Sequence, residues 1–83
     1  MQAETKRVGL MMLFEKMEYG ISFSDYIHNI VIGLKQIIGF NGIEKSDIYY
    51  LLLEDLNASG SPLALNEKQE FSKLAAPLIQ SKL

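Results

Sequence analysis

The segment that decides the fold is residues 22–38, which read SFSDYIHNIVIGLKQII. Apolar side chains recur along it at the spacing of one helix face from residue 23 to residue 38, which is far longer than a normal strand. Ser22 can cap the amide of Asp25 and Asp25 can return the bond, which marks a helix start. We therefore predict a helix here. Gly33, which costs about 1 kcal/mol relative to alanine inside a helix, is expected to let another helix approach closely.

Three further helices are expected around this segment. The first covers about residues 3–19 and ends at Gly20, the third runs from residue 44 or 45 to residue 57, and the fourth starts at an Asn66 cap. Residues 39–42 supply a turn, and Pro77 is expected to kink or shorten the fourth helix. A chain of 83 residues has room for one core. The sequence predicts a single all-α domain over residues 1–83, with four helices built from helical hairpins.

The expected core takes apolar residues from all four helices. It consists of Leu13, Phe14, Met17, Ile27, Ile30, Leu34, Leu52, Leu56, Phe71, Leu74 and Leu78. Ile48 and Leu51 continue the stripe of the third helix, whereas Met11 and Met12 lie off the face that the first helix buries.

The amino-acid composition limits the classes of protein to which this chain can belong. Apolar residues make up 48% and charged residues 22%, which is typical of a folded domain. The apolar run at residues 10–14 is too short for a signal peptide or a membrane span, so no membrane association is expected. The chain has no cysteine, and we take a cytoplasmic location as the default. A net charge of -2 disfavours nucleic acid as a partner.

Catalytic patterns are sparse in this sequence. His28 is the only histidine, and Asp25 three residues before it lies on the same helical side, where the two could orient a base or bind a metal. A metal site needs three or four ligands, and only two are present here. The favoured interpretation is therefore that Asp25 serves as a helix cap and that His28 lies at the edge of the core. The glycines form no phosphate-binding loop. We expect a protein that is not an enzyme and has no cofactor.

Surplus apolar surface is the feature that points to a function. The chain has more apolar side chains than the core-facing sides of four short helices can bury. The surplus comes from the methionine pair, the isoleucine-rich helix and the tyrosine pair, and such side chains are typical of binding surfaces. The alternative is a packed core with a few exposed apolar groups. We predict a regulator or inhibitor that binds another protein, with a basic partner favoured, and that forms a homodimer through the first or second helix. The candidate partner-binding residues are Met11, Met12, Tyr49, Tyr50, Glu54 and Asp55.

A helix-turn-helix regulator of transcription is the alternative function, because the second and third helices have its outline. The candidate recognition helix carries Glu44, Asp47 and Glu54 and would meet an anionic backbone. We therefore predict no duplex binding above nonspecific levels at physiological salt, measured by a gel shift. A sequence-specific shift at nanomolar protein would reverse the order of the two functions.

Overall fold

The computed structural model describes residues 2–38 and 43–83 and divides them into four helices. They are α1 (Gln2–Met17), α2 (Phe23–Ile38), α3 (Lys45–Ala58) and α4 (Leu65–Gln80). No strand occurs in either described stretch, so the predicted all-α class is confirmed. The turn expected at residues 39–42 lies outside the described residues.

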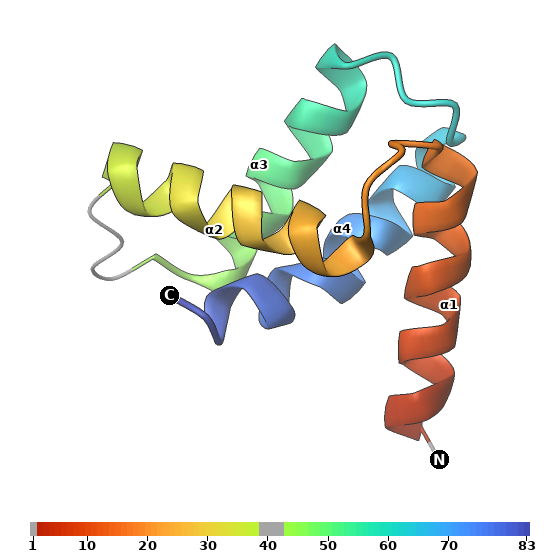
Figure 1. Cartoon of the computed structure of the whole chain (residues 1–83), viewed down its shortest axis with the longest axis horizontal. Helices are drawn as coiled ribbons and strands as arrows, with labels where there is room; N and C mark the ends of the chain where they lie inside the picture. The colour runs from red at the N-terminus through yellow and green to blue at the C-terminus, as the bar shows by residue number, and fades with distance from the viewer. Residues whose placement is uncertain (1, 39–42) are drawn as a thin grey trace.

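Helix α4 is the centre of the arrangement, because each of the other three helices packs against it. The contact with α3 is the most extensive and forms the expected hairpin, whereas α1 and α2 approach α4 from other sides (Figure 1). The N-terminal half of α1 extends beyond the other helices (Figure 1). Five buried residues of α4 line these contacts: Phe71, Ser72, Ala75, Ala76 and Ile79.

A cluster of aromatic rings joins α1, α2 and α4. The Phe14 ring lies 5.2 Å from the rings of both Phe23 and Tyr26, measured between centroids. Tyr26 also contacts Phe71 at 5.9 Å, and Tyr19 stacks on Tyr26 at 5.1 Å. Such pairs add about 0.5–1.5 kcal/mol each beyond the area they bury. The cluster therefore ties the α1–α2 junction to the central helix.

Most of the predicted core is found in the interior. Phe14, Met17, Ile27, Leu52, Leu56 and Phe71 are buried, and Leu13, Ile30, Leu34 and Leu74 are partly buried against them. The prediction was wrong for Leu78, which is 39% exposed, and for Leu51, which is 40% exposed. In α4 the buried face comprises Phe71, Ser72, Ala75, Ala76 and Ile79, and the small side chains at its middle let neighbouring helices come close. The periodicity of large residues extends the predicted face to Leu78, which lies at its exposed edge.

The helix starts depend on local hydrogen bonds. The Asp25 amide donates to Ser22 Oγ at 3.1 Å, so the predicted Ser22 cap is confirmed. At α3 the Glu44 amide donates to Asp47 Oδ2 at 3.2 Å. The predicted Asn66 cap is wrong, because α4 begins at Leu65 and Ala64 donates its amide to Glu67 Oε1 at 3.0 Å.

Two helix ends also differ from the prediction. Helix α1 ends at Met17 rather than at residue 19, because Glu18 already takes a left-handed backbone with φ of 52°. Gly20 has a φ of 77°, as a glycine at a helix end readily does. Pro77 does not shorten α4, which continues to Gln80, and the Ser81 amide donates to the Pro77 carbonyl at 3.1 Å.

The Tyr26 hydroxyl is an unusual group within the core. Its oxygen is buried and makes no hydrogen bond of normal geometry within the described part of the chain. Burial raises the pKa of Tyr26 above its ordinary value, and the neighbouring Tyr19 and Asp55 raise it further. The folded protein therefore holds this proton at a pH where the unfolded chain releases it.

We predict that the free energy of unfolding falls less at alkaline pH in Tyr26→Phe than in the wild type. The unfolded tyrosine ionises near pH 10, so the wild type loses stability as the pH rises above that value. At about pH 11 the variant should lose about 1 kcal/mol less than the wild type in urea unfolding. Tyr50→Phe is the control and should follow the wild-type profile, because Tyr50 is exposed in the folded protein. An equal alkaline loss in wild type and Tyr26→Phe would contradict the account.

Candidate functional site

The outer side of α3 presents an exposed stripe that we call the α3 outer face, made of Asp47, Tyr50, Leu51, Glu54 and Asp55. These positions follow the i, i+3, i+4, i+7, i+8 spacing of one helical side, and Leu51 and Asp55 at its edge adjoin the buried stripe of Ile48, Leu52 and Leu56. Tyr50 is 64% exposed. The face therefore combines an aromatic and an aliphatic side chain with three carboxylates.

Tyr49 has a different role from Tyr50. It is half-buried and packs against the core, while its ring meets the Tyr50 ring edge-on at a centroid distance of 5.1 Å. Of the predicted tyrosine pair, Tyr50 offers its surface to solvent and Tyr49 supports it from beneath.

The carboxylates of the α3 outer face give it a negative field. Glu54 and Asp55 lie in the last turns of α3, where the helix dipole disfavours negative charge by a few tenths of a kcal/mol. The structure records a salt bridge between Lys16 and Glu67 at 2.5 Å, but none at Glu54 or Asp55 within the described part of the chain. These two acids are therefore available to a basic group from outside.

A groove of about 220 Å³ runs between α2 and α3 at the edge of this face. It is lined by Ile30, Gly33, Leu34, Ile48, Leu51, Leu52 and Asp55. A Cβ built on Gly33 meets nothing within 4 Å, so the expected close approach of another helix to this glycine is wrong. Gly33 instead forms an open wall of the α2–α3 groove.

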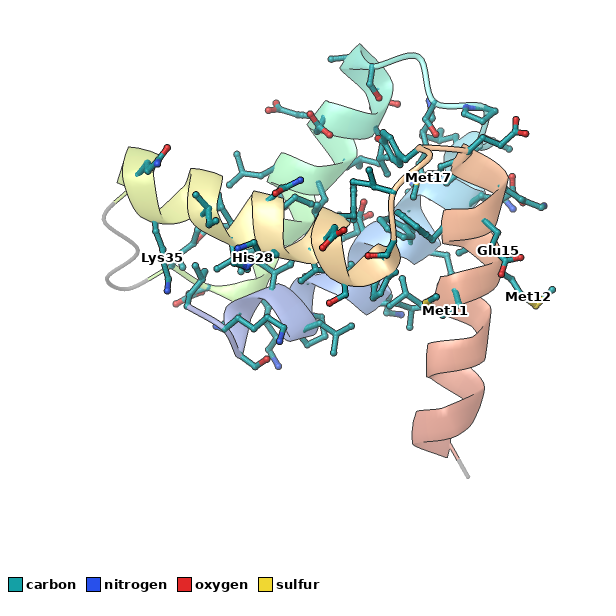
Figure 2. The ribbon with its side chains drawn as sticks, viewed as in Figure 1. Met11, Met12, Glu15, Met17, His28 and Lys35 are labelled. Atoms are coloured by element: carbon teal, nitrogen blue, oxygen red, sulfur yellow. The ribbon has the colours of Figure 1, made fainter. Side chains whose placement is uncertain are left out.

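The two methionines belong to a different surface. Met11 is partly buried and Met12 is 62% exposed, and both lie on α1. Figure 2 shows Met12 pointing away from the body of the domain, on the side of Glu15. The structure does not bring Met11 and Met12 together with Tyr50, Glu54 and Asp55, because α1 packs on α4 rather than beside α3.

A second and larger groove, of about 420 Å³, lies between α2 and the end of α4. Its lining includes the apolar Ile27, Val31, Ile32 and Leu78 and the basic side chains of His28, Lys35 and Lys82. Figure 2 shows His28 and Lys35 on the side of α2 that faces the C-terminal part of α4. Sequence reasoning missed this α2–α4 groove, although the i, i+7 spacing of His28 and Lys35 was a readable signal.

The histidine and its neighbours form no catalytic constellation in the described part of the chain. His28 and Asp25 are both exposed. Within residues 2–38 and 43–83, no three His, Cys, Asp or Glu side chains gather closely enough to share a metal ion. Over the same residues, no helix combines the length and the apolar character needed to span a bilayer.

Comparison with known protein families, with curated proteins and with solved structures gave no match.

We predict that Gly33→Ala stabilises the protein by about 1 kcal/mol, because alanine is the better helix former and its methyl group enters open space. Gly60→Ala is the matched control. It should destabilise by about 1 kcal/mol, since Gly60 has a φ of 68°. Thermal or urea unfolding measures both changes. A destabilised Gly33→Ala would show that the α2–α3 groove is not open in the folded protein.

Proposed function

We propose that this protein is a small, non-enzymatic interaction module, a regulator or inhibitor that binds a basic partner protein through the α3 outer face. The observation that carries the proposal is the continuity of exposed Tyr50 and Leu51 with the carboxylates of Glu54 and Asp55. A cytoplasmic location stays a prediction, as does self-association.

The parts of this face have different physical roles in binding. Tyrosine buries a large apolar ring while its hydroxyl keeps a polar contact, and such residues dominate the energy of many interfaces. The α2–α3 groove adds an apolar recess beside Leu51 for a side chain of the partner. The exposed carboxylates act mainly on the rate of encounter, so association should slow as salt is added.

The helix-turn-helix alternative receives no support from this arrangement. In that function α3 would enter the major groove, and its outward face presents Asp47, Glu54 and Asp55. Three carboxylates facing the phosphate backbone would repel it.

The test is affinity capture from the native cell followed by mass spectrometry, with binding to the recovered partner then measured directly. Tyr50→Ala is expected to weaken that binding by about 2 kcal/mol or more, as for an interface hot spot. Glu54→Lys should slow association and reduce its dependence on salt.

Glu70→Lys is the matched control, because it makes the same charge change at an exposed position of α4 outside the proposed surface. It should bind like the wild type. Unchanged binding by both Tyr50→Ala and Glu54→Lys would contradict the proposed function.

A further inference from the structure

The α3 outer face and the α2–α4 groove carry the same pattern with opposite charge. On α3 the order is Asp47, then Tyr50 and Leu51, then Glu54, at positions i, i+3, i+4 and i+7. The pattern on α2 has the same four spacings: His28, Val31, Ile32 and Lys35. In each helix the two polar ends are about 10 Å apart along the axis, since each residue rises 1.5 Å.

The groove has the surface chemistry that the α3 outer face needs in a partner. Ile27 and Val31 form the buried apolar floor of the groove. Ile32 and Leu78 lie at its rim and are about 40% exposed. Three of the residues that line it are basic, and none is acidic. The imidazole of His28 offers an N–H donor to a carboxylate in either protonation state. Asp25, one turn from His28 on α2, is not among the lining residues.

We propose that the occupant of the α2–α4 groove is the α3 outer face of a second copy of this chain. This inference rests on the proposed function of the α3 outer face and names its basic partner surface. Tyr50 and Leu51 of one copy cover the apolar floor and rim of the groove in the neighbouring copy. The carboxylates of Asp47, Glu54 and Asp55 meet the basic side chains of the rim.

The contact is head-to-tail, because each copy contributes two different surfaces. Its α3 outer face binds one neighbour and its α2–α4 groove binds another. A two-fold pairing of groove with groove would bring one basic surface against another, and a pairing of two α3 outer faces would oppose acids. A head-to-tail contact leaves a free groove at one end and a free α3 face at the other, so assembly continues past the dimer or closes into a ring.

Sedimentation equilibrium of two charge-reversal variants, alone and mixed, tests the proposal. Glu54→Lys disables the α3 face and leaves the groove intact, whereas Lys82→Glu disables the groove and leaves the α3 face intact. The wild-type average mass should rise with concentration beyond that of a dimer. Each variant alone should associate at least tenfold more weakly than the wild type. Their equimolar mixture should regain association, because an intact α3 face then meets an intact groove.

The matched controls are Glu70→Lys and Lys73→Glu, which change the same charges at exposed positions of α4 outside the groove lining. Both should associate like the wild type. Recovery in the mixture also shows that both variants are folded. A monomeric wild type, or variants that stay monomeric when mixed, would overturn the proposal. So would a Glu54→Lys protein that still associates alone.

The failure of this inference is distinguishable from the failure of the proposed function. If the wild type is monomeric but captures a foreign basic protein that Glu54→Lys loses, the second copy is the wrong partner and the α3 face is still the binding surface. If Glu54→Lys changes neither self-association nor capture, both proposals fail.

Discussion

Small residues along α4 allow the other three helices to pack around it. Ser72, Ala75 and Ala76 are almost completely buried, and they leave room for three helices to pack on a single one. Phe71 and Ile79 fill the space between those helices at either end of the small residues. The Ser72 hydroxyl oxygen is buried without a hydrogen-bond partner in the described residues. Such a group costs about 1–3 kcal/mol, which the close packing around α4 must offset.

Packing around one central helix explains why apolar surface is left over. Because α2 and α3 each turn one side toward α4, their other apolar residues have no neighbour to cover them, and Ile32, Tyr50 and Leu51 remain exposed. The same geometry leaves grooves on both sides of α2, one bordered by Asp55 and one by His28, Lys35 and Lys82. The proposed binding to proteins, including a second copy of the chain, depends on the opposite charges of the α3 outer face and the α2–α4 groove.

Much of the fold was readable from the sequence, because it depends on local patterns. The periodicity of α2 and the Ser22 cap involve residues close together in the chain, and both predictions are confirmed. On α4 the predicted core is confirmed at Phe71 and is wrong at Leu78, because periodicity weighs large side chains, whereas close helix contact also selects alanine and serine. Tyr50, Glu54 and Asp55 lie on one surface because they share one helix. Met11 and Met12 lie on another surface, which the sequence could not indicate, since only the tertiary arrangement decides which helices lie side by side.

The most direct measurement is a concentration series of amide NMR spectra on the uniformly ¹⁵N-labelled protein. We expect concentration-dependent shifts or broadening at two separate sets of residues. One set is on the α3 outer face, around Tyr50 and Glu54, and the other lines the α2–α4 groove, around Ile32 and Lys82. Amides near Met12 on α1 should stay unchanged. Changes confined to α1, or spectra that do not change with concentration at all, would contradict the account.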